Sequence, residues 1–190
     1  TSLFGRGRMP AVMNYSLGVQ QAVSRTMRLE VSYVGSVSRH LLWQRNINPV
    51  PIGARHLAEN RDATNTILPN NFLRPYRGYG DIFLFEFGGT ASYNSLQVQF
   101  HRRFNRGLHF RAAYTWAKTL GTANSDTARV SPFFEPRKWN YGRLNYDRDH
   151  VFTLAYTWPV PNGLLRESRW LRPLVARWEL SGTTMFSAGT

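Results

Sequence analysis

The chain has 190 residues, no cysteine and a formal net charge of +13 at pH 7. The absence of cysteine excludes disulfides and thiolate metal sites, and the absence of an apolar run of about 18 residues excludes a transmembrane helix. The first ten residues, TSLFGRGRMP, lack the apolar segment of a secretory signal. We therefore expect either a protein that is not exported or an internal piece of a longer chain.

Six segments alternate between apolar and polar residues with a period of two, which predicts β-strands. In chain order they are residues 13–22, 27–35, 94–104, 108–118, 150–159 and 177–187. Each has about the 9–11 residues that a tilted strand needs to cross a bilayer. The predicted fold is all-β and antiparallel, with little helix.

One face of these strands is apolar and carries no charged residue. Its members are Tyr15, Leu17, Val19, Met27, Leu29, Val31, Tyr33, Leu96, Val98, Phe100, Leu108, Phe110, Ala112, Tyr114, Trp116, Phe152, Leu154, Tyr156, Trp158, Trp178, Leu180, Gly182, Thr184 and Phe186. The other face is mostly polar, which predicts contact with water. Its candidates for lining a wet lumen are Arg28, Glu30, Gln97, Gln99 and Arg111.

The connections between the strands differ in length. Residues 23–26 and 105–107 form tight turns, whereas residues 36–92 and 119–149 form long loops. Short periplasmic turns and long extracellular loops are typical of outer-membrane barrels. The connection over residues 159–176 falls on the short-turn rim, although it is longer than the other two turns there.

Aromatic residues gather at both ends of the apolar face. Tyr15, Tyr33, Tyr114 and Trp116 lie toward the long loops, whereas Phe104, Trp158 and Trp178 lie toward the short turns. Amphipathic rings prefer the two membrane interfaces, so this placement favours a membrane barrel. A soluble β-sandwich is the alternative, although its core needs bulk in the middle of each strand.

The long loops carry the candidates for recognition of a ligand. Tyr76, Tyr79, Trp139 and Tyr141 are aromatic residues that either contact a ligand or pack loop against loop. Residues 56–62 favour one or two helical turns, and residues 82–87 predict a strand piece that belongs to a hairpin arm or extends the third strand.

Catalytic and metal sites are not predicted. Asp147, Asp149 and His150 form a short cluster with oxygen ligands that suit Ca²⁺, but it supplies too few ligands for a cation site, and a polar loop is the simpler interpretation. The sequence also lacks a metalloprotease helix motif, a nucleophile elbow and a phosphate-binding glycine loop. We expect no enzyme activity, no catalytic residue and no cofactor.

Eight motifs in order along nearly the whole chain resemble the barrel of the Oar-like TonB-dependent receptors. They are Asn14–Gln20, Glu30–Ser36 with Arg39–Leu41, Arg74–Tyr76 through Gly80–Ile82, Tyr93–Val98, Arg102–Phe104 with Arg106–Leu108, Ala113–Lys118, Asn145–His150 and Trp178–Gly182. The resemblance implies a Gram-negative outer-membrane barrel of about 22 strands that encloses a plug and is energised through TonB.

Several parts that the family implies are not recognised in residues 1–190. We expect a partial barrel domain without plug or signal peptide, a piece of the wall of an uptake or export channel. Its expected partners are outer-membrane lipid, the remainder of its own barrel and plug, the TonB complex through the plug, and a substrate that the sequence does not name.

The positive charge leaves one alternative function open, because an arginine-rich β-sheet protein could bind nucleic acid or a polyanionic glycan. The distribution of charge argues against nucleic acid. Residues 23–28, 102–107 and 159–177 on the short-turn rim hold nine arginines and one acid, whereas the long loops hold eleven basic and eight acidic residues. The excess on the rim, which includes Arg166, Arg169 and Arg172, predicts contact with anionic lipid headgroups, with solvated turns as the alternative.

Overall fold

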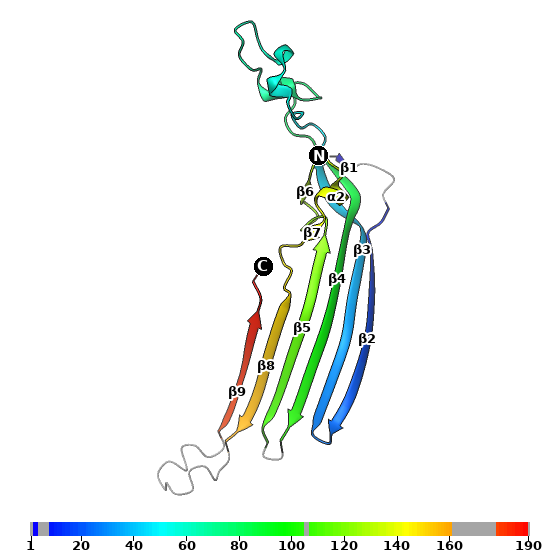
Figure 1. Cartoon of the computed structure of the whole chain (residues 1–190), viewed down its shortest axis with the longest axis vertical. Helices are drawn as coiled ribbons and strands as arrows, with labels where there is room; N and C mark the ends of the chain where they lie inside the picture. Colours follow the sequence, from blue (N-terminus) through cyan, green and yellow to red (C-terminus); the bar gives the residue numbers. More distant parts are fainter. Residues whose placement is uncertain (1, 4–7, 105–106, 161–177, 190) are drawn as a thin grey trace, which may run out of the picture. The chain divides into compact units, whose positions relative to one another are not determined.

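The computed structural model describes residues 2–3, 8–104, 107–160 and 178–189. Within them, six long strands dominate the chain (Figure 1). These are β2 (Ala11–Ser24), β3 (Met27–Asn46), β4 (Phe83–Arg103), β5 (His109–Gly121), β8 (His150–Pro159) and β9 (Glu179–Ser187). Each contains most or all of one predicted strand, so the predicted all-β antiparallel fold is confirmed.

The strands pair in chain order, β2-β3-β4-β5-β8-β9. Three two-residue strands join this path from the side: β1 (Ser2–Leu3) pairs with β4, β6 (Arg129–Val130) with β3, and β7 (Gly142–Arg143) with β5. The sheet does not close, because β2 and β9 end the path formed by the described strands. Their outer edges leave unpaired N–H and C=O groups, which further strands of a barrel would pair.

The register of the last three strands shows which residues share a face. Tyr114 lies opposite Phe152, which lies opposite Phe186, while Arg111 lies opposite Ala155 and then Thr183. Because side chains alternate across a strand, these two rows belong to opposite faces. The register therefore supports the predicted division into an apolar and a polar face.

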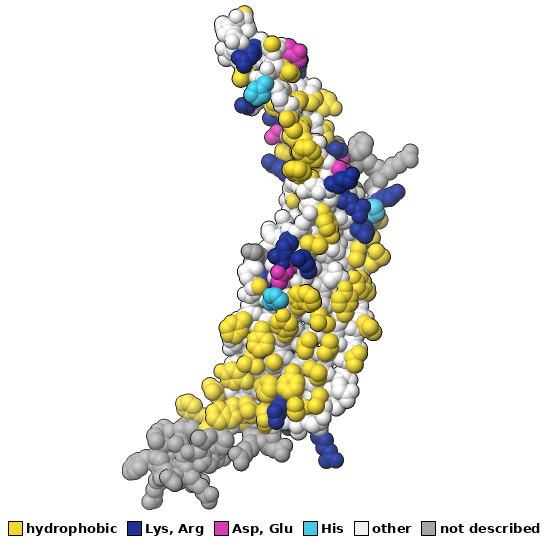
Figure 2. Space-filling model, in the orientation of Figure 1, with side chains coloured by type: hydrophobic (Ala, Val, Ile, Leu, Met, Phe, Trp, Pro, Cys, Tyr) yellow, Lys and Arg dark blue, Asp and Glu magenta, His cyan; other side chains and the backbone are white. Residues whose placement is uncertain are grey.

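The apolar face is exposed in this sheet. Leu17 is 75% exposed and Phe186 is 64% exposed, and Figure 2 shows hydrophobic side chains gathered over the strands. Rings on this face also contact one another, with centroids 5.5 Å apart for Phe100 and Phe110 and 6.4 Å apart for Phe152 and Phe186. An exposed apolar surface of this extent indicates contact with lipid or a partner.

A hydrogen-bonded aromatic cluster lies at the long-loop end of the apolar face. The hydroxyls of Tyr15 and Tyr33 both donate to Oδ1 of Asn94, at 2.9 and 2.8 Å. The ring of Tyr15 lies over Gly35, where a Cβ atom would overlap it. Asn94 thus links two strands to a third at the predicted interface belt, a role that the sequence did not reveal.

The predicted loop over residues 36–92 is wrong in its bounds. β3 continues to Asn46 and β4 begins at Phe83, so the loop itself covers only residues 47–82. The strand piece predicted for residues 82–87 is the beginning of β4, which agrees with the extension alternative. β5 likewise continues to Gly121, so the second loop begins later than residue 119.

Glycines explain why the extension of β3 and β4 was missed. Gly88 and Gly89 are typical of a loop, yet here both belong to β4 and lie in close contact with β3. A Cβ atom at Gly88 would lie 2.5 Å from the ring of Trp43, and one at Gly89 would lie 2.8 Å from the carbonyl oxygen of Leu41. Glu86 accepts a hydrogen bond from Trp43 Nε1 at 3.2 Å and pairs with Arg45, which ties the two extensions together.

The chain divides into two compact units. The first comprises described residues of the ranges 1–13, 37–92 and 120–144, and the second those of 14–36, 93–119 and 145–190. The first contains the short helices η1 (Ala54–His56), η2 (Ala58–Asn60), α1 (Asn70–Leu73) and α2 (Pro136–Trp139). No helix among the described residues is long and apolar enough to cross a membrane.

The assignment of faces predicts the effect of a charge at Phe110. Phe110→Arg in the full-length protein should lower the free energy of unfolding by about 2–4 kcal/mol if the ring lies near the bilayer midplane. Urea titration in lipid vesicles measures this loss. His109→Arg, on the opposite face one residue away, is the matched control and should cost less than about 1 kcal/mol. Equal losses for the two variants would show that the faces are assigned wrongly.

Candidate functional site

The polar face of the second unit forms a hollow of about 1250 Å³. Strands β2, β3, β4, β5, β8 and β9 all contribute to its lining, toward the short-turn ends. Because every second residue of each strand faces this side, hydroxyl, amide and charged side chains from neighbouring strands come together. Thr157, Ser181 and Thr183 supply the hydroxyls on the β8–β9 side.

The hollow is strongly basic. Its lining contains Arg25, Arg28, Arg103 and Arg111 together with His101 and His109, against a single acid, Glu30. Arg102 also borders the hollow, but its guanidinium lies over the ring of Phe104, 4.0 Å from the centroid, on the apolar face. Arg111 donates from Nε to Nδ1 of His101 at 3.2 Å, which fixes the guanidinium against the neighbouring strand. Arginines with one acid among them attract phosphate or carboxylate groups, so this wall favours anionic contacts.

The structure brings together four of the five residues that we predicted to line a lumen. Arg28, Glu30, Gln99 and Arg111 line the hollow, whereas Gln97 does not. Gln97 instead donates from Nε2 to Oγ of the buried Ser95 at 3.2 Å. His101, His109 and Arg103 were not proposed as site residues, although their alternation with the apolar face could have revealed them.

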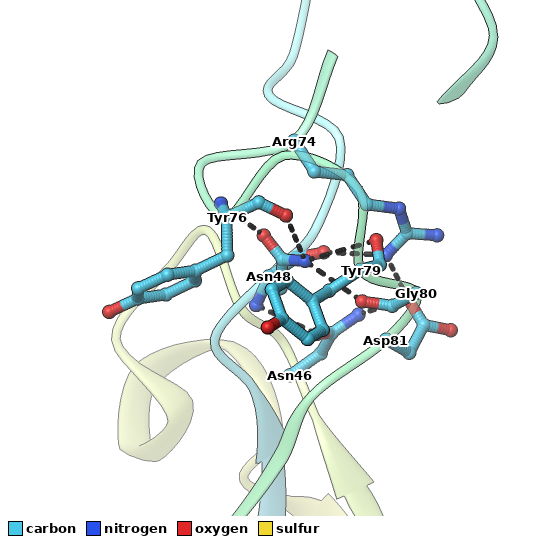
Figure 3. Close-up of polar contacts among 7 residues, drawn as sticks. All are labelled: Asn46, Asn48, Arg74, Tyr76, Tyr79, Gly80 and Asp81. Atoms are coloured by element: carbon cyan, nitrogen blue, oxygen red, sulfur yellow. Dashed lines mark hydrogen bonds and ion pairs between the residues drawn. The ribbon is translucent and has the colours of Figure 1, made fainter. Parts of the chain in front are cut away.

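A second organised region lies in the loop over residues 47–82 of the first unit. Asn48 is fully buried, and its Nδ2 donates to the carbonyl oxygens of Tyr76, Tyr79 and Gly80 at 3.1, 3.4 and 2.8 Å (Figure 3). Its Oδ1 accepts from the Tyr76 N–H at 2.8 Å. One side chain therefore joins the two ends of the loop.

Arg74 and Asp81 complete this junction. Arg74 Nη1 donates to the carbonyl oxygen of Asn48 at 2.5 Å and pairs with the Asp81 carboxylate, which also accepts from Asn46 Nδ2 at 2.7 Å. The hydrogen bonds from Arg74 and then Asn46 hold the pKa of the Asp81 carboxyl below its ordinary value of 3.8. Asp81 therefore stays ionised at neutral pH and stabilises the junction.

The four predicted ligand-contact residues of the loops are all exposed. Tyr76 and Tyr79 both lie at the Asn48 junction. In Figure 3 the ring of Tyr76 points away from the polar contacts. Trp139 stacks on Phe134 with ring centroids 4.5 Å apart, and the Tyr141 hydroxyl lies 3.3 Å from Ser92 Oγ. All four rings are thus exposed, and Trp139 and Tyr141 also contact neighbouring residues of the same unit.

An apolar hollow of about 500 Å³ lies beside the junction in the same unit. Its walls include Pro49 and Ile52 from one loop and Phe133 and Phe134 from the other. Ser131 Oγ accepts from the N–H groups of Phe133 and Phe134 at 3.3 Å each, which holds both phenylalanines in place. This hollow was not predicted, because the residues of its walls are far apart in the chain.

Asp147, in the acidic cluster considered as a cation site, has a structural partner. It is 5% exposed, and its Oδ1 accepts from the Thr119 N–H at 2.6 Å, next to the β5–β8 ladder. Asp149 also has partners of its own. Arg166, Arg169 and Arg172, which we predicted to contact lipid headgroups, lie outside the described residues.

The fold and its faces agree with the sequence comparison. The family model for the outer membrane beta barrel domain matches residues 5–190, so the chain belongs to this family. This membership places the protein in the outer membrane. The apolar face of the sheet therefore meets lipid and the basic hollow lies on the lumen side.

A solved structure shows the same fold. The chain is similar to the outer membrane transporter YddB from Escherichia coli, with a TM-score of 0.52 and 10% sequence identity over 80% of this chain. The chain spans 19% of the length of that transporter. No curated protein matches the sequence.

Asn48 gives a direct test of the loop junction. Asn48→Ala removes four side-chain hydrogen bonds from a fully buried position. The bond from the Asn48 backbone N–H to Asn46 Oδ1 remains. The carbonyl oxygens it leaves unpaired should each cost about 1–3 kcal/mol. Cleavage within residues 49–75 by a protease should become at least about tenfold faster. Asn70→Ala, which loses only an exposed bond to Arg55, is the control and should leave the rate unchanged.

The lowered pKa of Asp81 predicts a pH dependence of the same junction. The Asp81 carboxylate stabilises the junction fully above pH 3.8, which is the pKa of the carboxyl in the unfolded chain. This stabilisation is lost as the pH falls from 3.8 through the lower pKa of the folded protein. The rate at which pepsin cleaves the wild type within residues 49–75 should therefore increase as the pH falls below 3.8. The rate for Asp81→Asn, which has no carboxyl group at this position, should increase less. Parallel pH profiles for the two proteins would contradict the role of the carboxylate.

Proposed function

We propose that the chain forms part of the wall of a TonB-dependent outer-membrane receptor that moves a substrate through an energised channel. The observation that carries this proposal is the basic hollow on the lumen side, where four arginines and two histidines face one acid. A wall that only closed a barrel would not need this charge. A wall that guides an anionic substrate or holds an acidic plug would need a positive charge of this kind.

The Oar-like motifs supply the finer part of the proposal. They suggest that the complete protein contains a plug inside the barrel and contacts the TonB complex through that plug. The open edges of β2 and β9 support continuation into further strands of one barrel. The proposed role is transport rather than catalysis, with no cofactor, and a soluble protein that binds nucleic acid does not fit the outer-membrane family.

Uptake by cells tests the proposal. Three strains of the natural host would be compared with wild type: one without the full-length protein, one without TonB, and one with Arg28→Gln and Arg111→Gln. We expect at least one solute of a defined medium to be consumed more slowly in both deletion strains, as measured by mass spectrometry of the medium. The double substitution should slow uptake of the same solute by about tenfold, because it weakens the field that concentrates anions.

Arg28→Lys with Arg111→Lys is the matched control, because it keeps both charges on the wall. It should retain most of the uptake. A solute whose uptake needs this protein but proceeds normally without TonB would overturn the energised mechanism. Loss of uptake in the lysine variant as well would show that the wall does not act through its charge.

A further inference from the structure

A smaller hollow of about 290 Å³ lies on the first unit, between three segments of the chain. Its lining includes Arg39 of β3, Thr90 and Ser92 of β4, Arg137 of α2, and Tyr141, which follows α2. None of its lining residues is acidic. The hollow therefore combines two guanidinium groups with three hydroxyl groups.

The two arginines are available to a ligand. Both are exposed, and among the described residues neither has a hydrogen bond or an ion pair to the rest of the protein. Arg45 and Arg74, in the same unit, are instead paired with Glu86 and Asp81. Two unpaired cations on neighbouring segments repel one another unless an anion lies between them.

The hydroxyl groups complete a set of donors. The Tyr141 hydroxyl and Ser92 Oγ lie 3.3 Å apart at the edge of the hollow. Thr90 is 7% exposed, and its Oγ1 is buried without a hydrogen-bond partner among the described residues. Buried hydroxyls are nearly always hydrogen-bonded, so an unpartnered one beside two cations is unusual.

Within β3 and β4, the lining residues of the hollow belong to the alternating rows that carry Tyr33 and Asn94. Thr90 and Ser92 precede Asn94 and Leu96 at two-residue steps in β4, and Arg39 follows Tyr33 by three such steps in β3. Tyr33 and Asn94 belong to the aromatic cluster of the lipid-facing side. In the sequence of both strands the lining residues therefore continue these rows on the side of the long loops, which are extracellular in outer-membrane barrels.

We propose that this hollow binds a phosphate group carried by a lipid of the outer leaflet. Arginine pairs with phosphate through two parallel N–H···O bonds, and hydroxyl donors add further bonds to the remaining oxygens. Cations on the segments next to the extracellular loops of a barrel are also suited to attract the anionic headgroups of the outer leaflet. The site concerns anchoring in the membrane, and it does not depend on whether the protein transports anything.

Binding of defined lipids to the full-length protein tests the proposal. The protein would be purified in dodecyl maltoside, which contains no phosphate, and titrated with a glucosamine-disaccharide lipid that carries phosphate monoesters or with the same lipid after their removal. Native mass spectrometry would count the bound lipid. We expect the phosphorylated lipid to bind at least about tenfold more tightly, as loss of one charge-assisted pair would imply.

Variants then locate the site. Arg39→Gln with Arg137→Gln should abolish the preference for phosphate, and Tyr141→Phe should reduce it. The matched control, Arg77→Gln with Lys138→Gln, removes the same charge from exposed positions outside the hollow and should preserve the preference. Arg39→Lys with Arg137→Lys should keep part of it, which separates loss of charge from loss of folding.

Three outcomes would overturn the proposal. They are equal binding of the two lipids by the wild type, an unchanged preference in the double glutamine variant, and an equal loss in the control. A competition with inorganic phosphate distinguishes lipid from free oxyanions. If phosphate at the same concentration displaces the lipid, the hollow is a site for free oxyanions rather than for lipid. None of these lipid-binding outcomes predicts a change of uptake in the cell assay. Failure of this proposal can therefore be distinguished from failure of the proposed function.

Discussion

The structure depends on one constraint, that backbone N–H and C=O groups inside a bilayer must pair with other backbone groups. The β5–β8–β9 ladder meets it residue by residue, from His109 opposite Thr157 through Val151 opposite Ser187. Once this register is set, the face of each side chain follows, because a shift by one residue would turn every apolar group toward water. On these three strands, the apolar and the polar rows are both consequences of this pairing.

The period of two was sufficient to find the strands where lipid enforces it. Each of the six predicted segments overlaps one of the strands β2, β3, β4, β5, β8 and β9. Where the register is given, for β5, β8 and β9, it agrees with the predicted faces. The pattern failed at residues 37–46 and 83–92, where the strands continue but no longer show one continuous apolar face. There the packing of Trp43 on Gly88 replaces the alternation, and a single sequence does not reveal which glycine accepts which ring.

The arginines show that one residue type has different roles in different surroundings. Arg45 and Arg74 neutralise carboxylates in the first unit, whereas Arg28 and Arg111 leave a positive field on the lumen wall. The lumen wall could be predicted because alternation alone orients its side chains. The hollow between Arg39 and Arg137 could not, because it depends on where a loop folds back onto two strands.

The Asn48 junction separates what lies beyond it from the sheet. Because one buried side chain and the Arg74–Asp81 pair close the loop at its base, the residues between these two ends can change in sequence or number without moving β3 or β4. Lengthening a closed loop is inexpensive, since each doubling adds only about 0.6 kcal/mol of closure entropy. The tip of the loop can therefore change in sequence and in length while β3 and β4 keep their register.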